Sequence, residues 1–116
     1  MKESIIAQKT YFFAVRIVKL HLDICKREKY IFSLSNQLVR ASSSIGANVE
    51  EALGGHSRRE FSAKMSIAYK EAREAYYWIR LLIECGIIEE KLSTPLKMEI
   101  NEIIRILAAI VKSTKI

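Results

Sequence analysis

The sequence predicts an all-α fold, an up-down antiparallel bundle of four helices. Half of the 116 residues are apolar, and one proline with four glycines provides few of the turns that an all-β fold requires. Apolar residues also recur at helical spacing along four segments, which short polar or glycine-containing stretches separate. We expect helices at about residues 4–26, 31–53, 58–85 and 94–114, within a single domain over residues 1–116.

The first expected helix carries two apolar stripes, although a bundle core needs only one. One stripe contains Phe12, Val15, Val18, Leu22 and Cys25. The other contains Phe13, Ile17, Leu20 and Ile24. We interpret the surplus as a contact between subunits, and we assign that role to Phe13, Ile17 and Leu20.

The second expected helix combines an apolar seam with a run of small residues. The seam contains Leu34, Leu38, Ala41, Ile45 and Ala52, with Asn48 filling its gap. Residues 41–47 are mostly Ala, Ser and Gly, which lower helix propensity and are expected where another helix approaches closely. Asn48 either fixes the register of the core or is a core amide whose hydrogen bonds are satisfied. Gly54 and Gly55 end the helix.

The third expected helix has the most regular pattern. Ser57 and Glu60 form a capping box at its start. Its seam has alternating spacings of four and three residues and contains Phe61, Met65, Ala68, Ala72, Ala75, Ile79, Leu82 and Gly86. This seven-residue repeat predicts left-handed bundle packing. Because the alanines match the small residues of the second helix, we expect these two helices to be close antiparallel neighbours.

The fourth expected helix begins at Thr94 as N-cap with Pro95 at the first helical position, and an earlier short turn at residues 89–92 is the alternative. Residues 103–111 are apolar nearly all the way round, which one domain of four helices cannot cover. We therefore expect Ile104 and Val111 at a subunit interface, the alternative being scattered exposed apolar residues.

The formal charge of +6 favours anionic partners, because residues 1–49 carry eight basic residues against three acidic ones. The clearest basic and aromatic row lies on one face of the third helix and contains Lys70, Arg73, Tyr77 and Arg80. Further candidates are Lys2, Lys9 and Arg16 on the first helix, and Arg58 and Arg59 in the turn before the third. Such cations can neutralise phosphates, and an exposed tyrosine can stack on an unpaired base. Glu74 and Glu84, each four residues from a cation of the row, leave an ordinary mixed-charge surface open.

Catalytic and metal motifs are absent from the sequence. His21 and His56 have no acidic or thiol partner in local spacing, and no Glu-x-x-His, zinc or phosphate-loop motif occurs. We expect neither an enzyme nor a cofactor or metal. Two unpaired cysteines, no signal peptide and no apolar run of about 20 residues predict a cytoplasmic protein without a membrane partner.

The run QLVRASSSIGANVEEA at residues 37–52, followed by SRREF at residues 57–61, resembles the four helix bundle protein family. This family is also called the 23S rRNA intervening-sequence protein or S23 family, and the resemblance extends from about Tyr11 to the last helix. One departure is EEAL at residues 50–53, where members commonly have Glu-Gly. The resemblance implies a basic homo-oligomer, a ring of five, associated with nucleic acid and without a catalytic site. Some relatives are encoded within insertions in large-subunit rRNA genes, and others resemble accessory proteins of reverse transcriptases in diversity-generating retroelements.

Two functions remain open from the sequence. In the first, the oligomer binds structured or single-stranded RNA or DNA, mainly through phosphates. In the second, it is a protein-interaction scaffold or accessory subunit of a nucleic-acid-handling protein, for example a reverse transcriptase, and its charge serves solubility. The salt dependence of nucleic-acid affinity separates the two functions, because phosphate contacts release counterions.

Overall fold

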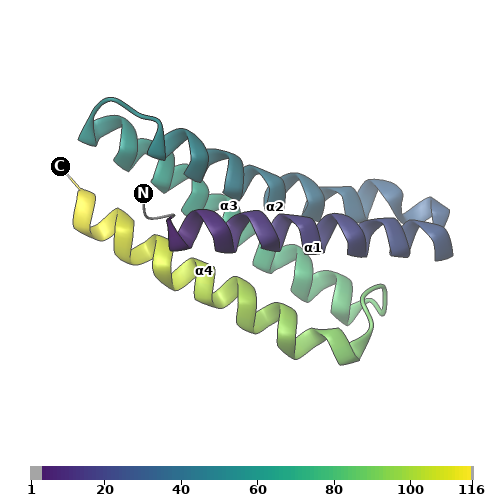
Figure 1. Cartoon of the computed structure of the whole chain (residues 1–116). Coiled ribbons are helices and arrows are strands. Elements are labelled where there is room, and N and C mark those ends of the chain that lie inside the picture. Colours follow the sequence, from purple (N-terminus) through teal and green to yellow (C-terminus); the bar gives the residue numbers. More distant parts are fainter. Residues whose placement is uncertain (1–3, 116) are drawn as a thin grey trace.

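The computed structural model describes residues 4–115, which form four long helices and no strand (Figure 1). The helices are α1 (Ile5–Arg27), α2 (Phe32–Leu53), α3 (Arg58–Glu84) and α4 (Ser93–Thr114). Single 3₁₀ turns at Lys29–Ile31 and Glu90–Leu92 precede α2 and α4. The bounds of the four long helices differ from the expected ones by no more than one residue.

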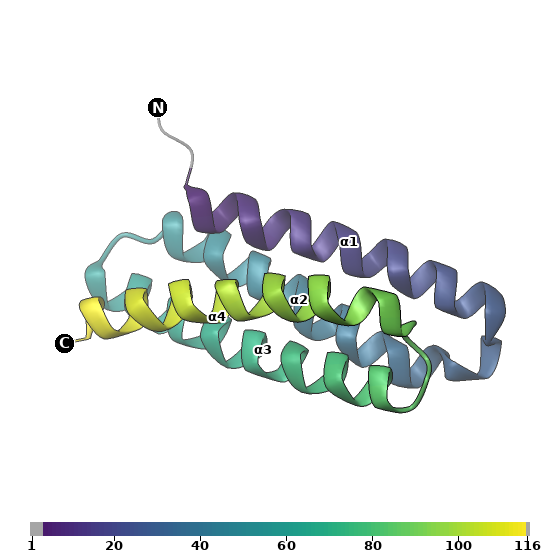
Figure 2. The same cartoon turned by 90° about the horizontal axis from the view of Figure 1, so that it is seen from below.

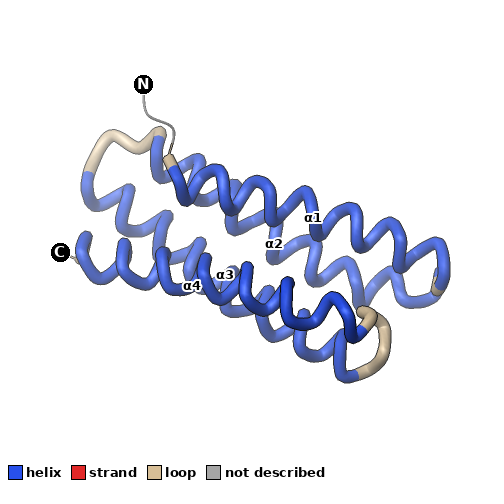
Figure 3. The backbone as a smooth tube through the Cα atoms, turned by 60° about the horizontal axis from the view of Figure 1, so that its bottom comes forward, coloured by secondary structure: helices blue, strands red, loops and turns tan. Residues whose placement is uncertain are grey.

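The helices run up, down, up and down in an elongated bundle of 45 × 24 × 20 Å. The start of α1 and the end of α4 lie at the same end of the bundle as the loop between α2 and α3 (Figure 2). Figure 3 shows that the other two connections lie together at the opposite end. Helices α2 and α3 pack most extensively, whereas α1 and α4 have the sparsest contact of the four neighbouring pairs. The predicted four-helix bundle, with α2 and α3 as close neighbours, is confirmed.

Small residues let the helices approach α2 closely. Ala68, Ala72 and Ala75 of α3 are fully buried, as is Ala41 of α2. Gly46 of α2 faces α1, because a Cβ atom added there would lie 3.5 Å from the backbone oxygen of Thr10. This is an ordinary van der Waals distance, so alanine would also fit at this position, and the close approach depends on small side chains rather than on the absence of a Cβ atom.

The replacement Ala72→Leu is expected to lower the free energy of unfolding by about 1–3 kcal/mol, because three extra carbons must fit into a seam without space. Ile67→Ala, at a side chain on the same helix that is 42% exposed, should cost less. Urea unfolding of both variants at one protein concentration measures the difference. A smaller loss for Ala72→Leu would contradict the α3 register.

The apolar stripe of α1 that we expected at a subunit interface is the buried one, and the other stripe is mostly exposed. Phe13, Ile17 and Ile24 are fully buried in the core of the chain, and Leu20 is partly buried against it. In contrast, Phe12 is 61% exposed and Leu22 is 57% exposed. The assignment of Phe13 and Ile17 to a subunit interface is therefore wrong, because the chain's own helices already cover both side chains.

Asn48 is also not the core position of α2. Its amide is partly buried and donates to the backbone oxygen of Ser44 (2.9 Å) and to Ser44 Oγ (3.1 Å), within the same helix. Val49 is the fully buried residue, because the seam advances four residues from Ile45. Of the two interpretations of Asn48, these contacts support the amide with satisfied hydrogen bonds, at a partly buried position beside the seam.

The helix ends largely follow the expected chemistry. The Glu60 backbone N–H donates to Ser57 Oγ (3.0 Å), and the Glu60 carboxylate accepts from the His56 backbone N–H (2.8 Å). The expected capping by Thr94 is wrong, because the chain enters α4 at Ser93 directly from the 3₁₀ turn. Gly86, with a φ of 75°, allows the chain to turn after α3.

Candidate nucleic-acid interface

The row on α3 presents its charges to solvent. Lys70, Arg73 and Arg80 are all exposed, and no carboxylate among residues 4–115 lies within ion-pair distance of them. The guanidinium carbon of Arg73 lies 5.9 Å from the centre of the Tyr69 ring, and that of Arg80 lies 4.8 Å from the centre of the Tyr76 ring. These cation–π contacts hold both guanidinium groups against α3 while leaving their positive charges uncompensated.

Glu74 does not neutralise this row. Its carboxylate pairs with Arg40 of α2 and accepts a hydrogen bond from Trp78 Nε1 (2.9 Å). Arg40 also contacts Glu71 Oε2 at 3.3 Å, so it links α2 to two carboxylates of α3. Because the charge of Glu74 is engaged in the contact between α2 and α3, the α3 row keeps its net positive charge.

A hollow of about 400 Å³ lies beside the C-terminal end of the row, between α3 and α4. Its lining residues, which define the α3–α4 hollow, are Tyr77, Arg80, Leu81, Ile83, Glu84 and Lys97. A second hollow of about 350 Å³ on α4 includes Lys97 and Arg105 in its lining. Sequence reasoning missed Lys97 and Arg105, because both come from a different helix and follow no local motif. Predicting them would have required the register in which α3 and α4 pack antiparallel to each other.

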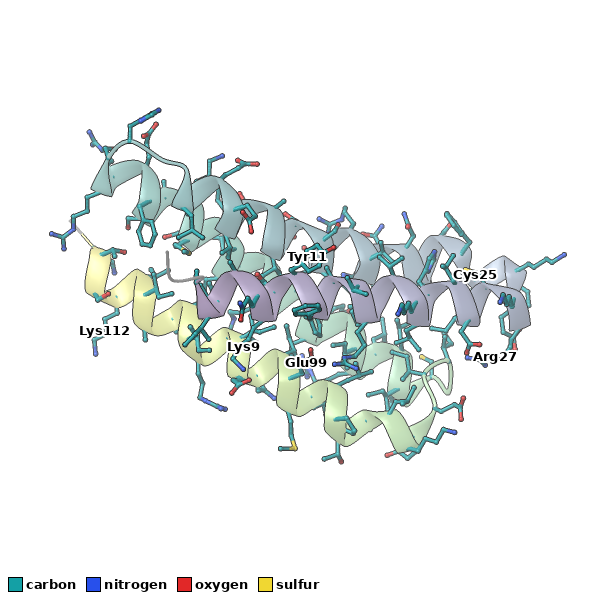
Figure 4. All side chains as sticks on the ribbon, viewed as in Figure 1. Lys9, Tyr11, Cys25, Arg27, Glu99 and Lys112 are labelled. Atoms are coloured by element: carbon teal, nitrogen blue, oxygen red, sulfur yellow. The ribbon has the colours of Figure 1, made fainter. Side chains whose placement is uncertain are left out.

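The N-terminal basic residues have a different environment. Lys9 Nζ lies 2.8 Å from Glu102 Oε1, and Arg16 Nε lies 2.7 Å from Glu99 Oε1. Figure 4 shows Lys9 and Glu99 between α1 and α4. The Lys9 ammonium holds the pKa of Glu102 below its ordinary value, through a hydrogen bond and charge attraction. These pairs join α1 to α4, so Lys9 and Arg16 already have carboxylate partners that a phosphate would have to replace. Lys2 lies outside the described residues.

The turn arginines lie apart from the α3 row. Arg58 Nη2 donates to the backbone oxygen of Ser113 (3.2 Å) and thereby ties the start of α3 to the end of α4. Arg59 is exposed, and it lies about 30 Å along α3 from Arg80 at 1.5 Å per residue. The structure therefore does not bring the three groups of candidate cations together.

The expected interface residues outside the core lie near α4. Leu20 lines a hollow of about 330 Å³ between α1 and α4, with Arg16 and Glu99 also in its lining. Ile104 and Val111 are partly buried against the chain's own core. All three side chains therefore serve the fold of a single chain, whatever further contact they make.

Comparison with known proteins shows which family the chain belongs to. The model of the family described as "23S rRNA-intervening sequence protein" matches residues 2–109. The chain belongs to this family. A solved structure from Bacteroides thetaiotaomicron, described as a protein of unknown function from the S23 ribosomal protein family, is similar with 38% identity and a TM-score of 0.86. The similarity covers 93% of this chain and 99% of that one, and no curated protein matches significantly.

In this member of the 23S rRNA-intervening sequence protein family, His21 is not isolated. Its Nδ1 lies 2.7 Å from Ser35 Oγ, and Cys25 Sγ lies 3.7 Å from its Nε2, in a largely buried position. The expectation that His21 has no thiol partner in local spacing is wrong, because Cys25 lies four residues further along the same helix. Sequence reasoning also missed the contact with Ser35, because that contact joins α1 to α2. Over residues 4–115, no group of three or more His, Cys, Asp or Glu side chains is arranged to hold a metal ion. No described helix is long and apolar enough to cross a membrane.

Proposed function

We propose that this chain is a non-enzymatic homo-oligomer that binds structured RNA or single-stranded nucleic acid through a basic surface on α3 and α4. This α3–α4 basic surface consists of Lys70, Arg73, Tyr77, Arg80, Lys97 and Arg105. The observation that carries the proposal is the lack of carboxylate partners for Lys70, Arg73 and Arg80 among the described residues, whereas Lys9, Arg16 and Arg40 all have such partners. Unpaired surface cations can exchange their counterions for phosphates.

The spacing of the row suits a phosphate backbone. Lys70 and Arg80 are ten residues apart, which is about 15 Å along the helix. Successive phosphates of a nucleic-acid strand lie only a few ångströms apart along the axis, for example about 3.4 Å in B-DNA, so a row of about 15 Å can contact several phosphates of one strand. The family description refers to an intervening sequence of 23S rRNA, which supports RNA as the first ligand to test.

The exposed stripe of α1 supports assembly with further copies of the chain. In the structure this stripe begins at Tyr11, and its residues Tyr11, Val15, Val18, Leu22 and Cys25 follow one another at spacings of four, three, four and three. Tyr11, Val18 and Leu22 are exposed, whereas Val15 and Cys25 are partly buried. Phe12 flanks the stripe. This spacing is the seam that one helix presents to another in helical assemblies, so a second copy is the partner that we propose. A ring of five, which the family resemblance implied, would repeat the α3–α4 basic surface and raise the avidity for a long nucleic acid.

The variant Lys70→Ala/Arg73→Ala/Arg80→Ala tests the proposal. It should bind a mixed-sequence RNA more weakly, and the slope of log K against log salt concentration should become less negative by about 2 to 3, because each lost phosphate contact contributes about 0.7–0.9. Fluorescence anisotropy between 50 and 200 mM salt, a range of concentrations that resolves such slopes, measures both changes.

The matched control removes the same number of positive charges from another part of the surface. Lys26, Lys29 and Lys112 are exposed and make no ion pair among the described residues, so Lys26→Ala/Lys29→Ala/Lys112→Ala should keep the parent slope. Equal effects of the two triple variants would contradict a specific surface. If the parent shows no salt-sensitive binding, the alternative function applies, that of a protein-interaction scaffold or accessory subunit, for example of a reverse transcriptase.

A further inference from the structure

We propose that the α3–α4 hollow binds one unpaired nucleobase and prefers guanine to uracil. The inference rests on the proposed function and specifies the ligand at one point of the same surface. It makes the protein a reader of single-stranded segments as well as a binder of phosphates. The argument uses the ring of Tyr77, the charges of Arg80 and Lys97, and the carboxylate of Glu84.

Tyr77 provides a platform that is held in place before binding. Its side chain is 50% exposed, and its ring meets the Trp78 ring edge-on at a centroid distance of 5.2 Å and an angle of 77°. Trp78 is in turn fixed by its hydrogen bond to Glu74, which Arg40 holds from α2. A pre-positioned exposed ring loses little conformational freedom when a base stacks on it, which favours binding.

The remaining walls of the hollow match the other parts of a nucleotide. Leu81 and Ile83 provide apolar lining, whereas Arg80 on α3 and Lys97 on α4 provide charges for the flanking phosphates. The hollow has a volume of about 400 Å³ and is largely open to solvent, so it can receive the face of one base while the flanking backbone stays outside. A paired base cannot enter, because its faces are stacked within the duplex, so the hollow selects unpaired bases.

Glu84 provides the base preference. It lines the hollow and makes no ion pair with Arg80, Lys97 or another described residue. An ionised carboxylate only accepts hydrogen bonds. Guanine presents two adjacent donors, N1–H and N2–H, to such a group, whereas uracil presents a single N3–H between two carbonyl oxygens that repel it. The carboxylate thus favours guanine.

The test compares three RNA probes of equal length by fluorescence anisotropy at 50 mM salt: oligo(U), oligo(U) with one central guanosine, and a mixed-sequence duplex. The parent should bind the guanosine strand more tightly than oligo(U). Tyr77→Ala should weaken both strands by about ten-fold or more and the duplex by less than two-fold, because base–aromatic stacking is lost. Tyr77→Phe should bind as the parent does. Lys97→Ala should weaken the strands, and Glu84→Gln should reduce the preference for guanosine.

Matched controls separate this site from general surface effects. Tyr30→Ala removes a more exposed tyrosine that does not line the hollow, and Lys112→Ala removes an exposed lysine near the other end of α4; both should bind as the parent does. Equal loss for strand and duplex, or no loss on Tyr77→Ala, overturns the inference and leaves phosphate binding standing. Equal parent affinity for oligo(U) and its guanosine form overturns the base preference. A parent without salt-sensitive binding overturns the proposed function and this inference together.

Discussion

Phe13→Ala should lower the free energy of unfolding by about 3–5 kcal/mol, whereas the same change at the neighbouring Phe12 should alter it by about 0.5 kcal/mol or less. Phe13 is 0% exposed, so removing its ring leaves a cavity in the hydrophobic core of the bundle. The Phe12 ring is mostly in water, so its removal leaves no cavity. The two variants delete the same atoms one position apart and therefore isolate the effect of burial.

Urea unfolding monitored by circular dichroism measures both values. The protein concentration should be low enough for light scattering to report single chains, because any loss of contact between copies would otherwise add to the effect of Phe12→Ala. A larger loss for Phe12→Ala under these conditions would mean that α1 is rotated by about one residue, or about 100°, relative to the structure described here.

Leu22→Glu should dissociate the proposed oligomer. Leu22 is 57% exposed in the single chain and is the fourth of the five residues in the four-three stripe of α1, where a second copy would bury an unpaired carboxylate. Burying such a charge costs several kcal/mol, which corresponds to an increase of the dissociation constant by about a hundred-fold or more. Sedimentation velocity or light scattering over a range of protein concentrations measures the change.

The matched control is Ile67→Glu, which introduces the same charge at a side chain of α3 that is 42% exposed and lies outside the stripe. It should leave the oligomer intact. Ile104 and Val111 are less informative positions, because their side chains pack against the chain's own core and a charge there also perturbs folding. A parent protein that sediments as a single species with the mass of one chain would exclude the oligomer.

The helices of this chain could be predicted because each carries its own periodic signal. The seam of α3 is read correctly from Met65 to Leu82, since its alternating spacing admits one helical face. The buried face of α1 could not be chosen, because two apolar stripes lie side by side. The polar residues Thr10 and His21 disguise the buried stripe in the sequence. In the structure their hydrogen bonds are satisfied, because Thr10 Oγ1 donates to the Ile6 backbone oxygen (2.8 Å) and His21 contacts Ser35.

The candidate site could be predicted only as far as it lies on one helix. Lys70, Arg73, Tyr77 and Arg80 share a face of α3 through spacing alone. The contribution of Lys97 and the pairing of Glu74 with Arg40 depend on which helices are neighbours and on their register. From the sequence, this face could be either a phosphate-binding row or an ordinary mixed-charge surface. The partner of Glu74 was needed to choose between them, and only the structure gives it.

The weak contact between α1 and α4 has a consequence for the order of folding. Within residues 4–115 it is the main contact between long helices that do not follow one another along the chain, and it is sparser than the contacts between consecutive helices. A topology of this kind has a low contact order and favours rapid folding. The α2–α3 hairpin, with the densest packing, can form as the nucleus on which α1 and α4 dock from either side. On this topology we expect the pairs Lys9–Glu102 and Arg16–Glu99 to form last, after most of the chain entropy has been lost.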